Sequence, residues 1–243
     1  MNARERMLAR LRATAPALVS PEEIHRIDER IDSHYDGRRD MLPAAARTTQ
    51  ALIDAMQAAL TASHAEVFRM TEQAWPALIA RRLEQANVKR LLVDTSSNEG
   101  AALSRALPSS IEPRAYDQTI EAWKSELFET IDAGFTVARS GIASTGTLVL
   151  VPDAGSPRTA SLVPPLHIAV VYANSLHADL HAAMRAERWA WNMPTNLVLV
   201  SGPSKTSDIQ QTLAYGAHGP RELWVVIVEG EGDAKPLANG EQA

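Results

Sequence analysis

Short, continuous runs of apolar residues, many of them β-branched, recur along the chain from about residue 64 onward, with amphipathic helical segments between them. The clearest runs are residues 90–94, 167–171, 196–200 and 223–228. A strand that is apolar on both sides must be covered on both sides, which is typical of a parallel sheet between helices. The sequence therefore predicts an α/β fold, with a mainly parallel sheet and helices on both of its faces.

Three parts of the chain differ in their pattern. Residues 1–63 are rich in alanine and charged residues at helical spacing, and Ser20 followed by Pro21 indicates a helix start. These residues are predicted to form an N-terminal helical extension. Residues 64–229 carry the alternating strands and helices of the α/β domain. Residues 230–243 are rich in Gly, Glu and Asp, and they are predicted to form a flexible C-terminal tail.

Composition excludes several classes of function. A net charge of −5 argues against nucleic-acid binding, which needs clustered Lys and Arg. Because the 243 residues include no cysteine, they supply no disulfide, no cysteine nucleophile and no thiolate ligand for zinc or an iron–sulfur cluster. No signal peptide is visible and the apolar runs are too short to span a bilayer, so we expect a cytoplasmic protein without a membrane span.

Residues 141–147, Gly-Ile-Ala-Ser-Thr-Gly-Thr, lie between two strand-like runs and crowd three hydroxyl groups into one turn. Glycines permit the close approach of a ligand, and free N–H groups in a turn can bind an anion. The spacing of Gly141 and Gly146 is not followed by the Lys of a Walker A phosphate loop, and a strand follows where that loop would open a helix. Two interpretations stay open, an anion-binding turn and a plain hairpin turn.

Two further loops border buried strands. Residues 201–208, Ser-Gly-Pro-Ser-Lys-Thr-Ser-Asp, supply hydroxyl groups and the cation Lys205, and are predicted to lead into a short helix whose N-terminus would favour an anion. Residues 216–220 place His218 in a glycine-rich turn, and the usual histidine pKa of about 6.5 suits proton transfer. The alternatives are ordinary helix capping and a turn histidine without a chemical role.

The other histidines give weaker signals. His167 enters a strand and is interpreted as a hydrogen-bonded histidine at a strand edge. Asn174 is predicted to cap a helix that runs to about residue 188, which would place His177 and His181 four residues apart on one helical face. That spacing can hold a metal ion, but no third ligand is evident, so we expect a solvated face and no metal on this chain.

We expect the three loops to converge on one pocket, because ligand sites of open α/β sheets gather at the carboxyl ends of strands. The candidate ligand-binding residues are Ser144, Thr145, Gly146, Thr147, Gly202, Ser204, Lys205, Thr206, His218 and Gly219. His218 is the candidate for a catalytic role, and the expected ligand is a small-molecule anion.

Four segments together resemble the LUD-domain family, and within it the lactate-utilisation protein C group. They read GIASTGTLVL at 141–150, LVPPLHI at 162–168, SGPSKTSDI at 201–209 and GAHGPREL at 216–223. The resemblance covers essentially the whole chain and is strongest from residue 135 to residue 228. It implies a NagB/RpiA/CoA-transferase-like fold that is also similar to 5-formyltetrahydrofolate cyclo-ligase.

The resemblance also implies a function. Members of the family act with two iron–sulfur proteins that oxidise L-lactate to pyruvate, so the clusters are expected on partner subunits and no cofactor on this chain. The chain would then be a cluster-free component of a lactate dehydrogenase complex rather than a complete enzyme. The alternative is an independent cyclo-ligase-like or CoA-transferase-like enzyme that binds a nucleotide, a folate or an acyl-CoA. The family supplies no catalytic residue that can be transferred to this sequence.

Overall fold

A computed structural model describes residues 2–13, 19–40, 48–207 and 213–230 of the protein. The chain separates into two compact units, residues 1–43 and residues 44–243. The predicted C-terminal tail lies outside the described residues from position 231 onward. None of the helices in the described ranges combines the length and the apolar character needed to cross a membrane.

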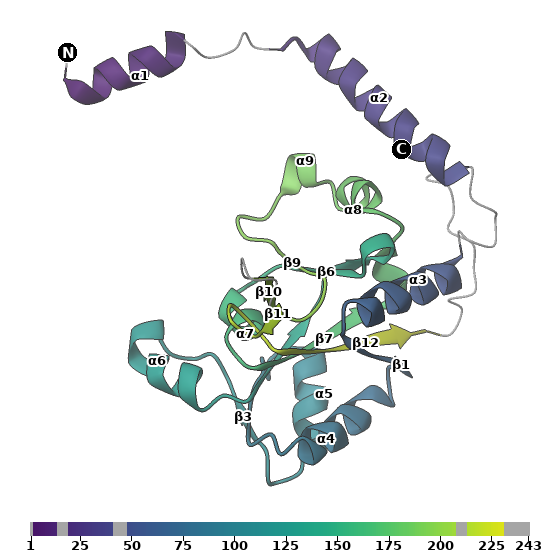
Figure 1. The fold of residues 1–243 in the computed structure, drawn as a ribbon, viewed down its shortest axis with the longest axis vertical. Coiled ribbons are helices and arrows are strands. Elements are labelled where there is room, and N and C mark those ends of the chain that lie inside the picture. Colours follow the sequence, from purple (N-terminus) through teal and green to yellow (C-terminus); the bar gives the residue numbers. More distant parts are fainter. Residues whose placement is uncertain (1, 14–18, 41–47, 208–212, 231–243) are drawn as a thin grey trace. The chain divides into compact units, whose positions relative to one another are not determined.

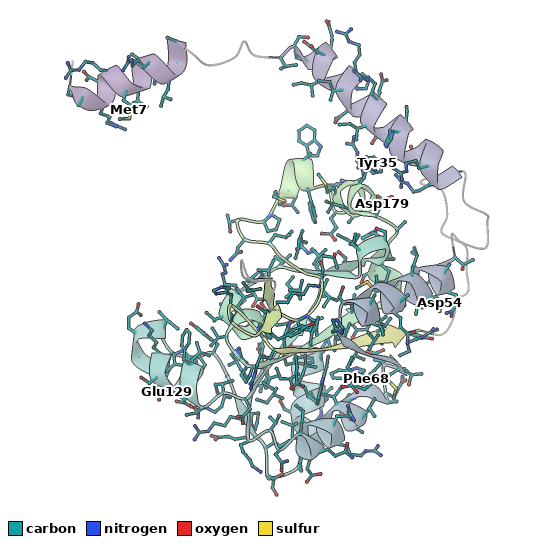
Figure 2. All side chains as sticks on the ribbon, in the orientation of Figure 1. Met7, Tyr35, Asp54, Phe68, Glu129 and Asp179 are labelled. Atoms are coloured by element: carbon teal, nitrogen blue, oxygen red, sulfur yellow. The ribbon has the colours of Figure 1, made fainter. Side chains whose placement is uncertain are left out.

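The first unit contains two helices, α1 (Ala3–Ala13) and α2 (Pro21–Asp40), in agreement with the predicted helical character of this region. The α2 helix begins where the sequence predicts, because the Ser20 hydroxyl accepts a hydrogen bond from the Glu23 N–H at 3.2 Å. Apolar side chains on both helices are exposed, among them Met7 and Tyr35, which Figure 2 labels.

The second unit is built on a six-stranded sheet in which every neighbouring pair of strands is parallel. Across the sheet the strands are β1 (Glu66–Thr71), β12 (Glu222–Glu229), β7 (Leu166–Tyr172), β4 (Ala133–Val137), β2 (Arg90–Leu92) and β3 (Glu112–Arg114). Successive residues of β12 enter two different cores, Leu223 and Val225 on one face and Trp224 and Val226 on the other. The predicted parallel α/β sheet is therefore confirmed.

Helices cover both faces of this sheet (Figure 1). On one face, α4 (Trp75–Gln85) and α5 (Asn98–Ala106) share a core in which Trp75 stacks on Phe135 with ring centroids 5.8 Å apart. On the other face, α3 (Thr49–Ala62) buries an apolar stripe that includes Met56 and Leu60. Two further helices, α6 (Ile120–Glu129) and α7 (Arg158–Leu162), pack around Leu92 near the β3 edge.

A second, four-stranded sheet lies on the α3 face of the main sheet, and the sequence does not predict it. Its strands are β8 (Leu176–His177), β5 (Ser140–Ile142), β6 (Thr147–Leu150) and β9 (Val198–Val200), with antiparallel pairing of β5 with β6 and of β6 with β9. The run 196–200 thus enters this sheet as an edge strand. Leu199 is exposed there, so the strand needs cover on one side only.

Short elements complete the second unit. They are η2 (Ala143–Thr145), η3 (Ala173–Ser175), α8 (Leu180–Ala186), α9 (Trp189–Asn192), β10 (Lys205–Ser207) and β11 (Leu213–Tyr215). The short helix predicted to follow residues 201–208 is not found in the described part of this segment, where β10 and β11 form an antiparallel pair, and residues 208–212 lie outside the described residues. Asn174 lies in η3, and the helix assigned to it begins later, after Asp179, whose carboxylate accepts from the Ala182 N–H at 2.8 Å.

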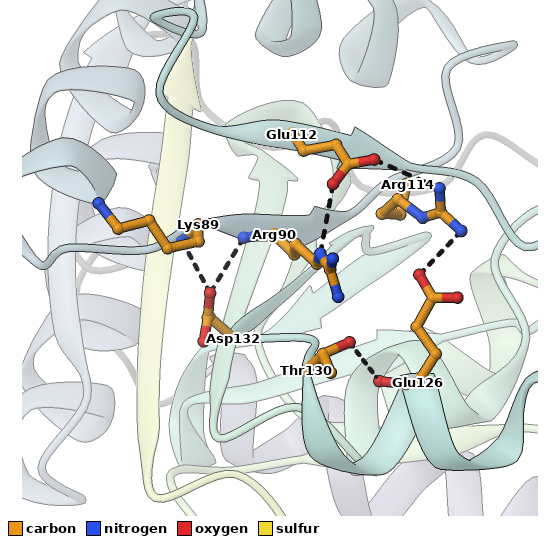
Figure 3. Close-up of polar contacts among 7 residues, drawn as sticks. All are labelled: Lys89, Arg90, Glu112, Arg114, Glu126, Thr130 and Asp132. Atoms are coloured by element: carbon orange, nitrogen blue, oxygen red, sulfur yellow. Dashed lines mark hydrogen bonds and ion pairs between the residues drawn. The ribbon is translucent and has the colours of Figure 1, made fainter.

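Polar contacts fix the β2–β3 edge of the main sheet (Figure 3). The Asp132 carboxylate accepts hydrogen bonds from the backbone N–H groups of Lys89 at 2.7 Å and Arg90 at 3.0 Å. Arg114 on β3 forms an ion pair with Glu126 on α6 at 2.8 Å. These contacts tie β2, β3, α6 and the start of β4 to one another.

Candidate functional site

A pocket next to the first residues of β7 and β12 brings two of the predicted loops together. Its lining consists of Ser161, Leu162, His167, residues 198–204, residues 218–220 and Leu223, and we call it the histidine pocket. Its volume is about 190 Å³. An engineered cavity of roughly 150 Å³ can hold a benzene molecule, so the histidine pocket suits a ligand of only a few heavy atoms.

Backbone hydrogen bonds hold the two loops in place. The Ser204 N–H donates to the Pro220 carbonyl at 2.8 Å, and the Gly216 N–H donates to the Ser204 carbonyl at 2.9 Å. The Arg221 N–H donates to the carbonyl of Pro165, at the entry to β7, at 2.8 Å. Gly219 has no Cβ, and one placed there would lie 3.2 Å from the Cβ of Ser204. Close packing of these loops therefore depends on the small residue at 219.

His167 closes the inner wall of the histidine pocket. It is the second residue of β7, lies opposite Gly134 on β4 and Leu223 on β12, and is only 1% exposed. Its Nε2 lies 2.8 Å from the Oγ1 of Thr136, while its Nδ1 is buried and has no hydrogen-bond partner among the described residues. The prediction of a hydrogen-bonded histidine is thus confirmed for one ring nitrogen, but the other is left unsatisfied beside a cavity.

The surroundings of His167 keep its imidazole neutral. Burial disfavours the charged form and lowers the pKa of His167 to about 4. A neutral ring carries one proton, and the tautomer with that proton on Nε2 can donate to Thr136. The other tautomer would bury an N–H group with no acceptor, which proteins avoid more strictly than a bare acceptor. Nδ1 is therefore best described as an unshared lone pair on a ring that lines the pocket.

A second cavity, the switch pocket, lies on the other side of Thr136. Its lining is Asp94, Ser97, residues 135–137, residues 150–153, residues 156–158 and Ser161, and its volume is about 100 Å³. The chain leaves β2 toward β3 but leaves β4 toward β7, in the opposite direction, so this pocket lies at the crevice where open α/β sheets bind ligands.

Charged groups line the switch pocket, in contrast to the histidine pocket. One Asp94 carboxylate oxygen accepts from the N–H and the hydroxyl of Ser96 at 2.9 and 2.6 Å, and the backbone at Gly155 approaches the other oxygen closely. The guanidinium of Arg158 has no partner among the described residues. Ser161 borders both pockets, and Thr136 links the switch pocket to His167, so the two cavities share one wall.

The predicted ligand-binding residues separate into two groups. Gly202, Ser204, His218 and Gly219 line the histidine pocket, together with Ser201. Lys205 and Thr206 belong to β10 and do not line it, and neither do Ser144, Thr145, Gly146 and Thr147. The first loop contacts the second through a chain of hydroxyl groups. The hydroxyl oxygen of Thr147 lies 2.7 Å from that of Thr145 and 2.7 Å from that of Ser201.

Within residues 141–147 the geometry is that of a hairpin connection. Gly141 and Ile142 pair with β6, and the Ser144 and Gly146 N–H groups donate to the carbonyls of Ala178 and Ala143. Gly146 has a φ of 59°, and a Cβ there would lie 2.7 Å from the backbone N of Leu60 on α3. This glycine thus allows the turn to pack on α3, and the N–H groups of Ser144 and Gly146 already have acceptors.

His177 and His181 do not share a helix face, contrary to the prediction. His177 is in β8 and His181 is in α8. His177 lies beside Glu187, whose carboxylate also accepts hydrogen bonds from Ser140 and from the Trp189 indole N–H. Burial lowers the pKa of His177, and Glu187 partly opposes that effect. Within the described ranges, no group of three or more His, Asp or Glu residues is arranged to hold a metal ion.

Reasoning from the sequence missed the residues that join the two cavities, Thr136 and Ser161, and the switch pocket around Asp94 and Arg158. One signal was available. Thr136 is a polar residue in an otherwise apolar strand run, and alternation along β4 places it on the face opposite Phe135.

Comparisons with known proteins agree with this architecture. A family model of the LUD domain matches residues 53–228. An uncharacterised protein of Neisseria meningitidis serogroup B is 39% identical over 94% of both chains. A lactate utilization protein C of Oceanobacillus iheyensis is 23% identical over 93% of this chain and 98% of its own, and one of Deinococcus radiodurans is 36% identical over 40% and 46%.

A solved structure supports the fold. The crystal structure of a DUF162 family protein from Deinococcus radiodurans superimposes with a TM-score of 0.55 at 22% identity, over 74% of this chain and 98% of that one. At this identity the likeness concerns the fold alone. The LUD-domain match extends over most of the second unit, including both cavities and all three loops. The chain therefore belongs to the LUD-domain family.

Proposed function

We propose that this protein functions in lactate utilisation, as a cluster-free component of a system that oxidises L-lactate to pyruvate, and that the histidine pocket binds a small anion. The names of several relatives support the lactate role, including one that aligns over nearly its whole length. The observation that carries the site assignment is the histidine pocket itself, small and lined by Ser204, His218 and a buried imidazole.

The absence of cysteine supports a role in which partner proteins, and not this chain, carry the clusters. Iron–sulfur clusters are held by cysteine thiolates, and the 243 residues contain none. The two electrons removed from lactate would then pass to clusters on two iron–sulfur partner proteins. Co-purification from native cells tests this part of the proposal, and recovery of the chain without such partners would count against it.

Deletion of the gene should abolish growth on L-lactate as sole carbon source and leave growth on pyruvate intact, because only the oxidation step is lost. Complementation with the wild-type gene should restore growth, and complementation with His218→Ala should restore it poorly. His25→Ala is the matched control, because His25 is an exposed residue of α2 whose ion-pair partner is the exposed Glu29. Growth curves on the two carbon sources, with immunoblots for protein level, provide the measurement.

Normal growth of the deletion strain on L-lactate, in a background with no second copy, would reject the lactate role. The independent cyclo-ligase-like or CoA-transferase-like enzyme would then be the function to test. Full complementation by His218→Ala would instead restrict the failure to the role of that side chain in the pocket.

A further inference from the structure

We infer that His167 is the ligand-contacting base of the histidine pocket, and that its Nδ1 accepts a hydrogen bond from the hydroxyl group of a small 2-hydroxy acid. The identity of the acid rests on the proposed function, whereas the assignment of His167 rests on its geometry. His218, the candidate from the sequence, then has a secondary position at the open side of the same pocket.

The unsatisfied Nδ1 of His167 points to a ligand. Buried polar atoms nearly always have a hydrogen-bond partner, and each exception calls for an explanation. The described residues contain six buried side-chain atoms without one, on Arg82, Ser104, Arg114, Trp123, Thr159 and His167. Among these residues, His167 alone lines either of the two cavities described above. A ligand in the histidine pocket can therefore complete the hydrogen bonding of this ring.

The tautomer of His167 decides which chemical group Nδ1 can bind. The Thr136 hydroxyl, 2.8 Å from Nε2, is a partner for that nitrogen in either tautomer, and the cost of burying an Nδ1–H group without an acceptor favours the proton on Nε2. The neutral ring then offers a lone pair at Nδ1, which attracts an O–H donor and repels a carboxylate. A site built to hydrogen-bond a substrate hydroxyl discriminates strongly against an analogue that lacks it. A 2-hydroxy acid should accordingly bind better than the corresponding 2-oxo acid.

The rest of the pocket provides for the carboxylate of such a ligand. The Ser204 hydroxyl has no hydrogen-bond partner among the described residues, and the His218 ring is exposed. Among the described residues, no Asp or Glu lines the histidine pocket, whereas Asp94 and Asp153 line the switch pocket beyond Thr136. The carboxylate should therefore lie toward Ser204 and His218, with the hydroxyl group directed inward to His167.

Calorimetric titration of the full-length chain with L-lactate and with pyruvate tests the inference. We expect the wild type to bind L-lactate at least tenfold more tightly than pyruvate. His167→Asn should weaken L-lactate binding at least tenfold and change pyruvate binding little. Thr136→Val should weaken L-lactate binding, because it removes the hydrogen-bond partner of Nε2, and Thr136→Ser, which keeps the hydroxyl group, should bind L-lactate nearly as the wild type does. His25→Asn, in α2 of the first unit and not among the residues that line the pocket, is the matched control and should bind as the wild type does.

A second measurement guards against variants that fail to fold. In the wild type with ¹⁵N-labelled histidine, saturation with L-lactate should shift the Nδ1 resonance of His167 and leave Nε2 protonated. An unchanged Nδ1 resonance at saturation would overturn the inference, as would equal affinities of the wild type for L-lactate and pyruvate, or a folded His167→Asn variant with wild-type affinity. A wild-type chain that binds neither acid would overturn the anion site of the proposed function, and the ligand assigned here with it.

Discussion

Replacement of Gly134 by alanine should destabilise the second unit by roughly 2–4 kcal/mol, because the added methyl group has no space. A Cβ at this position would lie 2.0 Å from the carbonyl oxygen of Ala160 and 3.1 Å from the side chain of Pro164. The φ of Gly134 is not in the left-handed region, so the cost arises from the clash alone. Since Ala160 belongs to α7 and Gly134 lies opposite His167, the strain falls directly on the wall of the histidine pocket.

Urea denaturation followed by tryptophan fluorescence measures this effect, because all five tryptophans lie in the second unit. Gly37→Ala is the matched control: a Cβ there has nothing within 4 Å, and Gly37 belongs to α2 in the first unit. The control should leave the fluorescence transition unchanged. A Gly134→Ala variant that unfolds at the wild-type urea concentration would show that α7 can move away from the sheet at no cost.

Gly134 also shows where reasoning from sequence reaches its limit. A glycine after a helical stripe is typical of a helix end, but here the helix ends at Glu129 and Gly134 lies inside β4. The reason for a glycine is the close approach of α7, which follows it by more than twenty residues. Contacts between distant segments leave little trace in a local pattern.

The strands were predictable where burial is complete. Residues 168–171 of β7 and 223–228 of β12 are all apolar because both faces of these strands pack into cores, and a continuous apolar run is the direct sign of that situation. The run 196–200 looks similar in sequence, yet it forms an edge strand of the second sheet. Which sheet a short strand joins depends on its partners, and a single sequence does not specify them.

The candidate site was predictable in part. Glycine and serine in residues 201–204 and 218–220 indicate loops near a cavity, and the structure places them together. The helix expected after residues 201–208 is not found in the described part of that segment, because β10 pairs with the distant strand β11 there, and residues 208–212 lie outside the described residues. The sequence predicts only a structural role for His167. Its Nδ1 is unsatisfied because distant loops bury the ring, and only the folded chain reveals this.

Because His167 is buried, acidification from pH 7 to pH 4 should lower the free energy of unfolding by about 3 kcal/mol. The pKa of His167 falls to about 4 in the folded protein, against 6.5 for an ordinary histidine, so the unfolded chain binds the extra proton first. Stability is therefore complete above pH 6.5 and declines as the pH falls toward 4. The cause is desolvation, since Thr136 is uncharged and the carboxylates of Asp94 and Asp153 line the neighbouring pocket.

The free energy of unfolding of the wild type and of His167→Asn, measured in urea at several pH values between 7.5 and 4, isolates this contribution. The difference in the free energy of unfolding between the wild type and His167→Asn should narrow or reverse as the pH falls, because asparagine does not titrate. His177→Asn is the matched control: burial also lowers the pKa of His177, but Glu187 and Asp179 oppose that shift, so its removal should flatten the pH profile less. Parallel profiles for the wild type and His167→Asn would mean that water reaches the ring, and the closed inner wall of the histidine pocket would be wrong.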